Sequence, residues 1–132
     1  MEDIAKLLHE PDAVVAVVGA TDDPSKYGHT IYRDLKRKGF RVLAVNPNRA
    51  TVDGDIAYPT LADLPTAPTI VDYVVPPPVT LDVLRQARSL GYTKAWVQPG
   101  AENPAVLTYL QTEGFDYLAN ACIMVRSRLI ES

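Results

Sequence analysis

Five short apolar runs, separated by helical patterns, constrain the possible folds of this chain more than any other feature. The runs are Ala13–Val18, Val42–Val45, Thr69–Val75, Lys94–Val97 and a weaker one at Asp116–Ala119. The first, second and fourth do not alternate polar with apolar residues, which is typical of strands buried on both faces. Such strands predict a parallel sheet covered by helices on both sides.

Helical patterns occupy the intervals between the runs. Apolar residues recur there at helical spacing, over Thr30–Lys38, Thr80–Leu90 and Asn103–Glu113. Thr80 and Asn103 are the expected N-caps, and Pro104 suits the first position of the helix that follows Asn103. A further helix is expected over Glu2–His9, and a short helical turn over Thr60–Leu64.

A glycine followed by an aromatic residue ends three of these patterns and precedes a strand each time. The pairs are Gly39-Phe40, Gly91-Tyr92 and Gly114-Phe115. Glycine accepts the left-handed conformation that ends a helix, and the next apolar residue packs back on its last turn. Repeated strand–helix alternation predicts an α/β fold with a five-stranded parallel sheet between two layers of helices, joined by right-handed crossovers.

The composition is that of one globular domain spanning residues 1–132. With 132 residues and 47% apolar side chains, the chain can build its own core. A net charge of −3 excludes a disordered acidic tail and a broad basic surface for nucleic acid. The single cysteine, Cys122, suits a reducing compartment. Because Ala13–Ala20 is too short to span a membrane and Met1–Ile4 is unlike a signal peptide, we expect a cytoplasmic protein.

The carboxyl ends of parallel strands meet at one edge of a sheet, where open α/β sheets bind ligands. We therefore expect a ligand site in the loops that follow the five runs. These loops are Gly19–Gly28, Asn46–Ala50, Pro76–Pro78, Gln98–Gly100 and Asn120–Cys122. The three consecutive prolines predict either a stiff apolar wall against a flat ring or alkyl chain, or a rigid connector between strand and helix.

The first of these loops has features of a phosphate site. It bears Gly19 and Gly28 and leads into a helix near Tyr27, whose backbone N–H groups and dipole favour a phosphate. Lys26 in the same loop and Arg49 in the next would suit a ligand with several phosphates. The plainer alternative is that both cations are solvated loop charges.

Two observations argue against a dinucleotide cofactor. The interval from Gly19 to Gly28 is too long for the G-x-G-x-x-G fingerprint, and Asn46 stands where NAD-binding proteins usually carry an acid for the ribose. Catalytic candidates are few, because neither His9 nor His29 has a carboxylate partner in a matching motif, and no serine elbow, Walker loop or metal-spaced ligand set is present. The sequence favours binding without catalysis or a metal; a small NAD(P)-linked oxidoreductase or enzyme subunit is the alternative.

Several short pieces, taken in order, resemble a known family. They are Val17–Thr21, Ser25–Gly28, Val45–Pro47, Tyr58–Pro65, Asp72–Pro78, Trp96–Gly100 and Cys122–Val125. Their order and spacing resemble those of stand-alone CoA-binding proteins, a family similar to the N-terminal CoA-binding domain of the succinyl-CoA synthetase α subunit. The resemblance runs from Ala13 to Val125 and implies a Rossmann-like domain with CoA lying across the strand ends.

The resemblance also implies which residues meet each part of CoA. The phosphates would meet the first loop, at Gly19, Ala20, Thr21, Ser25, Lys26, Tyr27 and Gly28. The nucleotide end would lie by Asn46, Pro47 and Arg49, the adenine or pantetheine side along Val74, Val75, Pro76 and Pro77, and the thiol end toward Gln98, Pro99 and Gly100. Cys122 would either reach the thiol of CoA or fill the core, and the packing role is favoured.

The sequence departs from the synthetases in two ways. Their glycine-rich loop after the second strand is replaced by Asn46–Gly54, and the sequence holds no second domain with a phosphorylated histidine. The resemblance therefore implies binding of CoA or acyl-CoA by a carrier, sensor or accessory module, and not ligase activity. We expect a small ligand rather than nucleic acid or a membrane, with a protein partner or homo-oligomer left open.

Overall fold

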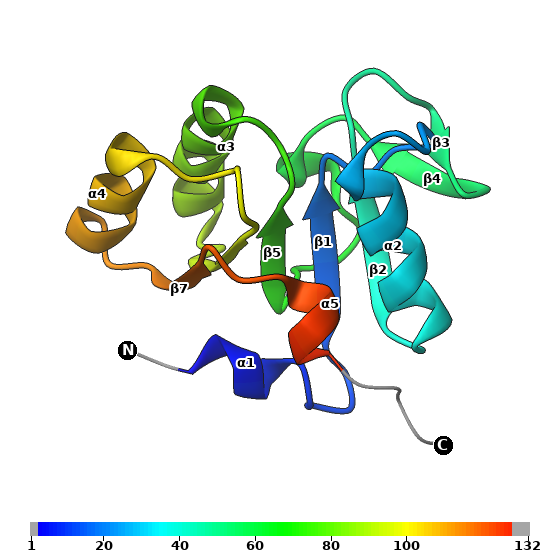
Figure 1. Cartoon of the computed structure of the whole chain (residues 1–132), viewed down its shortest axis with the longest axis horizontal. Helices are drawn as coiled ribbons and strands as arrows, with labels where there is room; N and C mark the ends of the chain where they lie inside the picture. Colours follow the sequence, from blue (N-terminus) through cyan, green and yellow to red (C-terminus); the bar gives the residue numbers. More distant parts are fainter. Residues whose placement is uncertain (1–2, 128–132) are drawn as a thin grey trace.

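A seven-stranded sheet forms the middle layer of the structure, a computed structural model that describes residues 3–127 (Figure 1). The strands are β1 (Val14–Val18), β2 (Arg41–Val45), β3 (Thr51–Val52), β4 (Asp55–Tyr58), β5 (Ile70–Tyr73), β6 (Lys94–Val97) and β7 (Asp116–Ala119). Their order across the sheet is β3-β4-β2-β1-β5-β6-β7. Neighbouring strands run parallel except β3 and β4, which pair antiparallel.

The five predicted strands are confirmed, with ends that differ by at most two residues, but the predicted number of five is wrong. The two additional strands, β3 and β4, form a hairpin whose two-residue turn is Asp53-Gly54. Both turn residues have positive φ, 51° and 78°, as the tight turns that fit the twist of paired strands require. The Asp-Gly pair was the available signal; β3 has only two residues and the four residues of β4 form no apolar run.

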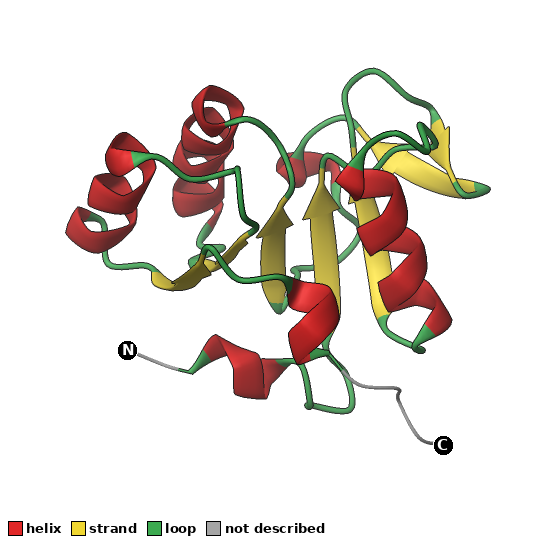
Figure 2. Ribbon diagram, in the orientation of Figure 1, coloured by secondary structure: helices red, strands yellow, loops and turns green. Residues whose placement is uncertain are grey.

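Helices cover both faces of the sheet, as predicted, and give a Rossmann-like three-layer fold (Figure 2). One face carries α1 (Ile4–Leu7), α2 (Tyr27–Arg37) and α5 (Ile123–Arg126). The other carries α3 (Pro77–Leu90), α4 (Pro104–Thr112) and the short 3-10 helix η1 (Leu61–Asp63). The predicted helical turn at 60–64 is thus confirmed, and the predicted helix at 2–9 is shorter, with residue 2 outside the described part of the chain.

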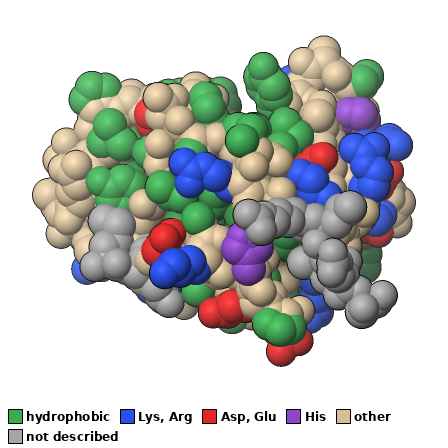
Figure 3. Space-filling model, turned by 60° about the horizontal axis from the view of Figure 1, so that its bottom comes forward, with side chains coloured by type: hydrophobic (Ala, Val, Ile, Leu, Met, Phe, Trp, Pro, Cys, Tyr) green, Lys and Arg blue, Asp and Glu red, His purple; other side chains and the backbone are tan. Residues whose placement is uncertain are grey.

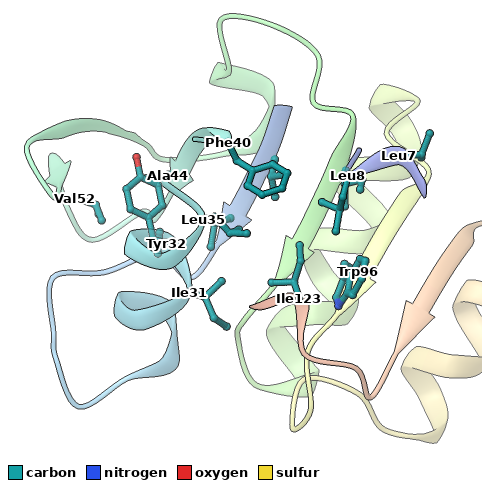
Figure 4. Close-up of a cluster of buried hydrophobic side chains, with 14 of the residues drawn as sticks. Leu7, Leu8, Ile31, Tyr32, Leu35, Phe40, Ala44, Val52, Trp96 and Ile123 are labelled. Atoms are coloured by element: carbon teal, nitrogen blue, oxygen red, sulfur yellow. The ribbon is translucent and has the colours of Figure 1, made fainter. Parts of the chain in front are cut away.

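The central strand shows why the apolar runs do not alternate. All five residues of β1 are buried. Val15 and Val17 pack into the cluster under α2 and α5, whereas Ala16 and Val18 pack into the cluster under α3 and α4. In the first cluster, Ile31 and Leu35 of α2 point toward the sheet, at the spacing that predicted this helix; Figure 4 shows this cluster.

The three glycine–aromatic joints share one hydrogen-bond geometry. The amide after each glycine donates to a carbonyl five residues earlier: Phe40 to Leu35 at 3.1 Å, Tyr92 to Ala87 at 2.8 Å and Phe115 to Leu110 at 3.1 Å. The glycines have φ of 96°, 83° and 74°. This pattern is the Schellman termination, so the predicted joints are confirmed.

One of the two predicted N-caps is confirmed, and the other is wrong. Asn103 caps α4, because its side-chain oxygen accepts from the Val106 amide at 2.9 Å. Thr80 does not cap α3, because this helix already begins at Pro77, and the Thr80 hydroxyl donates back to the Val75 carbonyl at 3.2 Å. Proline at the first helical position is pre-set for the helix, which explains the earlier start.

The surface near the amino ends of the strands is mixed in charge. Figure 3 shows this side obliquely, with basic and acidic side chains interspersed.

None of the helices within residues 3–127 is both long enough and apolar enough to cross a membrane.

Replacing Gly91 by alanine tests the joint at the end of α3. A Cβ at this position would meet no atom within 4 Å, so the φ of 83° is the only cost. We expect Gly91→Ala to lower the free energy of unfolding by about 1 kcal/mol, measured by urea denaturation. Gln86→Ala, an exposed position of the same helix, is the control and should change stability little. Equal stability of Gly91→Ala and the wild type would contradict the joint.

Candidate functional site

The carboxyl ends of the strands form one continuous rim. The ladder extends one residue past five of the strands, β1, β2, β5, β6 and β7. The backbone bonds run from Gly19 to Val45 (3.0 Å), Asn46 to Tyr58 (2.9 Å), Val74 to Val18 (2.9 Å), Gln98 to Tyr73 (3.1 Å) and Asn120 to Val97 (3.0 Å). The predicted common edge is therefore confirmed. β1 lies between β2 and β5, so the strand order reverses at its end, the position where open α/β sheets bind ligands.

Two glycines bring the first loop and α2 into direct backbone contact. A Cβ on Gly28, in the first turn of α2, would overlap the Gly19 carbonyl oxygen. A Cβ on Gly19, where φ is 100°, would lie 2.5 Å from the Val74 carbonyl oxygen. Only glycine at both positions lets the loop, α2 and the end of β5 meet here.

The start of α2 presents backbone donors at the rim. Its N-cap is Lys26, whose side chain makes no capping hydrogen bond. The first N–H groups of a helix lack partners inside the helix, and together with the dipole they favour an anion. The exposed Tyr27 follows at the first helical position, with 73% of its surface exposed.

Short-range hydrogen bonds shape the remainder of the first loop. The Thr21 hydroxyl accepts from the Asp23 amide at 3.1 Å, and the Asp23 carboxylate accepts from both the amide (3.0 Å) and the hydroxyl (2.7 Å) of Ser25. The Ser25 hydroxyl is therefore engaged inside the loop. The bonds from Ser25 lower the pKa of Asp23, and the charges of Lys26 and Arg49 lower it further.

Lys26 and Arg49 thus lie in the same neighbourhood, on either loop beside Asp23. Lys26 is exposed and has no ion-pair partner among residues 3–127. Arg49 reaches the Asp22 carboxylate only at 3.9 Å. Both cations are consequently available to an anionic ligand at this part of the rim.

Asn46 links the first two loops of the rim. Its side-chain nitrogen donates to the Ala20 carbonyl at 2.9 Å, and its side-chain oxygen accepts from the Asn48 amide at 2.8 Å. An aspartate could accept the second bond but could not donate the first. The amide at this position is therefore part of the loop architecture, while Pro47 beside it is exposed.

The proline run lies where β5 passes into α3. Val74 and Val75 are half-buried, Pro76 is the exposed N-cap of α3, and Pro77 is its first residue. Val75 packs against Gly19, since a Cβ there would lie 2.8 Å from one of its methyl groups. The run is thus a connector from strand to helix, and it also leaves an apolar edge beside the first loop.

Gln98 turns its side chain into the protein rather than to the rim. It is 3% exposed, its nitrogen donates to Asp72 at 2.6 Å, and its oxygen accepts from the Ile123 amide at 3.3 Å. Pro99 and Gly100 are exposed, and Gly100 has a φ of 90°. A ligand at this end would therefore meet the Pro99-Gly100 turn, with the Gln98 side chain behind it.

Asp72 is the polar residue of this region that sequence reasoning missed. It is fully buried in β5, and burial raises the pKa of its carboxyl to about 7, against the opposing hydrogen bond from Gln98. It is the single acidic residue in the apolar run 69–75, and this was the available signal. Its partner lies 26 residues away in the sequence, so no local pattern links the two.

The remaining candidates do not form a catalytic set. His29 is half-buried in the first turn of α2, and His9 is exposed before β1, at the other end of the sheet. Cys122 is half-buried at the N-cap of α5 and is a free thiol. The structure brings none of these side chains within hydrogen-bonding distance of another among residues 3–127.

Comparison with known proteins matches residues 13–128 to the CoA binding domain family. The acetate–CoA ligase (ADP-forming) II subunit α of Pyrococcus furiosus is 35% identical over 63 residues, and acetate–CoA ligase (ADP-forming) I of Archaeoglobus fulgidus is 36% identical over 63 residues. These matches cover 47% and 48% of this chain, but only 14% and 9% of the two relatives.

Solved structures extend the similarity to nearly the whole chain. A conserved hypothetical protein from Pyrococcus furiosus has a TM-score of 0.84 and 41% identity, with 87% of this chain and 99% of that chain covered. A dinucleotide-forming acetyl-coenzyme A synthetase of Ca. Korarchaeum cryptofilum, in complex with phosphate and ADP, has a TM-score of 0.76 and 27% identity, with 98% and 31% covered. The chain therefore belongs to the CoA binding domain family and is homologous to the CoA-binding domain of ADP-forming acetate–CoA ligase α subunits.

Proposed function

We propose that this protein binds CoA or acyl-CoA across the carboxyl ends of its strands and acts as a carrier, sensor or accessory module without catalysis of its own. The observation that carries this proposal is the Gly19–Gly28 contact, which brings the open N-terminus of α2 and the Lys26 and Arg49 side chains to one part of the rim. Backbone donors and two cations together suit a ligand with several phosphates.

The successive parts of CoA lie against successive loops of the rim. The diphosphate lies against Gly19 and the first turn of α2, and the nucleotide end lies by Pro47 and Arg49. The apolar edge from Val74 to Pro77 takes the adenine or pantetheine side, and the thiol end reaches the exposed Pro99-Gly100 turn. The curated relatives with the matching segment are CoA ligases, which supports this ligand class.

The NAD(P)-linked alternative is the weaker reading. A ribose-binding acid after β2 would have to replace Asn46, whose side-chain nitrogen donates to the Ala20 carbonyl. A hydride-transfer enzyme also needs an acid or base near its substrate, and the half-buried His29 has no carboxylate partner within residues 3–127.

Removing the cations tests the phosphate contacts. We expect Lys26→Ala and Arg49→Ala each to weaken CoA binding by about tenfold, because a hydrogen bond to a charged group contributes about 1.5–3 kcal/mol. Titration calorimetry measures the affinities, with Lys6→Ala on α1 as the surface-lysine control. The variant that removes the cation contacting the 3′-phosphate should lose less affinity for dephospho-CoA than for CoA. Unchanged affinity in both variants would refute the assignment.

A ligand screen separates the two functions. Thermal shifts with CoA, acetyl-CoA, NAD, NADP and FMN should show stabilisation by the first two, since a ligand at 100 times its dissociation constant stabilises by about 2.7 kcal/mol. Stabilisation by NAD or NADP alone would favour the alternative.

Gly28→Ala tests the backbone contact itself. The added methyl group must displace the Gly19 carbonyl and so shift the loop from the N-terminus of α2. We expect CoA affinity to fall at least tenfold, as one displaced charge-assisted contact of about 1.4 kcal/mol would produce. Gly114→Ala is the matched control, because its φ of 74° adds strain without any contact within 4 Å. Similar CoA affinities of the two variants would contradict the proposal.

A further inference from the structure

Asp72 is a buried acid without a counter-charge. In the register of the sheet it lies between Val17 of β1 and Trp96 of β6, beside the cluster that α2 and α5 cover. One carboxylate oxygen accepts from Gln98 at 2.6 Å, and the other has no hydrogen-bond partner among residues 3–127. An ionised carboxylate in such a place is costly, so the acid favours its protonated form.

A short chain of hydrogen bonds connects this acid to the C-terminal segment, Asn120–Ser127. The Gln98 side chain bridges Asp72 and the amide of Ile123, the first residue of α5. Ile123 is fully buried and lies beside Trp96 (Figure 4). The indole nitrogen of Trp96 donates to the Ala121 carbonyl at 2.8 Å. The start of the segment is therefore held by the same side chains that enclose Asp72.

No charge on the packed elements compensates Asp72. Its neighbours on β1 and β6, Val17 and Trp96, do not titrate. α2 carries the half-buried His29 in its first turn, and its C-cap Lys38 is bound to the far end of the segment, at the Met124 carbonyl (2.8 Å) and the Ser127 hydroxyl (2.9 Å). The segment itself carries Cys122 and the exposed Arg126, and α1 carries the exposed Lys6. Burial alone raises the pKa of Asp72, to about 7.

We propose that Asp72 is a positioning residue that makes the docking of the C-terminal segment depend on pH: the neutral acid stays buried beneath the docked segment, whereas a carboxylate without its proton favours an opened segment that admits water. Because Asn120–Cys122 and Pro99-Gly100 lie on the same rim, the segment also controls the thiol end of the ligand site; this part rests on the proposed function.

The direction of the effect follows from the proton balance. The closed form keeps the proton until about pH 7, whereas opening exposes Asp72 to water and returns its pKa to about 4. The closed form is therefore favoured at low pH. Its population relative to the open form falls by about tenfold for each pH unit between 5 and 7, and it levels off above pH 7.

The single tryptophan gives a specific readout. Hydrogen exchange of the Trp96 indole N–H and the Ile123 amide is followed by NMR from pH 5 to 8.5, without ligand and corrected for base catalysis. In the wild type we expect protection at both sites to fall with rising pH and then level off. Asp72→Asn keeps the acceptor for Gln98 and cannot ionise, so its protection should stay flat. Flat protection in the wild type, or the same slope in both proteins, would overturn the proposal.

Two control variants test whether another titratable side chain causes the pH transition. Cys122→Ser removes the thiol of the segment, and Asp82→Asn removes an exposed acid on α3; both should keep the wild-type transition. Loss of the transition in Cys122→Ser would assign it to the thiol and refute the role of Asp72. If Asp72→Asn does not fold, the wild-type and Cys122→Ser titrations decide by themselves.

Ligand binding then tests the coupling to the site. Affinities for CoA and for adenosine 3′,5′-bisphosphate, which lacks the pantetheine arm, are compared at pH 5.5 and 7.5. The preference for CoA should fall with rising pH in the wild type and not in Asp72→Asn; an unchanged preference would refute the coupling. A pH-dependent protection without CoA binding would refute the proposed function alone, and CoA binding with flat protection would refute the role of Asp72 alone.

Discussion

The backbone contact between Gly19 and Gly28 is the constraint on which the ligand rim depends. Without a Cβ at either position, the loop after β1 can turn directly onto the first turn of α2 and against the end of β5. This turn fixes the position of the N-terminus of α2. The Asn46 side chain then connects the next loop to the first loop by donating to the Ala20 carbonyl. The positions of Lys26 and Arg49 follow from these backbone contacts rather than from any contact between the cations.

The two faces of the sheet differ in how their helices are held. The face under α3 and α4 is closed by long helices with regular ends, and its core is apolar apart from the buried Tyr73 hydroxyl and Thr80. The face under α2 and α5 carries the buried pair Asp72 and Gln98 beneath a helix of one turn. A single-turn helix contributes little stability of its own, so its docking depends on side-chain contacts such as those of Ile123 and Lys38.

Much of the fold could be predicted because its signals are local. The apolar runs define five strands, and each glycine–aromatic joint marks a helix end within a few residues. The β3–β4 hairpin was missed because β3 has only two residues and the four residues of β4 form no apolar run, although the pair Asp53-Gly54 indicates its turn. The rim followed from the parallel topology, but the partnership of Asp72 with Gln98 depends on tertiary register, which no local pattern contains.

The strand order also has a consequence for synthesis of the chain. β2 follows β1 closely in the sequence, but the other edge of β1 has no partner until β5 has been made. The other pairs of neighbouring parallel strands are separated by much shorter stretches of sequence than β1 and β5 are. An apolar, fully buried strand is therefore exposed along one edge during translation, which is the condition under which nascent chains mispair or recruit chaperones. The reversal of strand order at β1, where we propose that the ligand binds, is thus also the point at which the growing polypeptide has an unpaired apolar edge for longest.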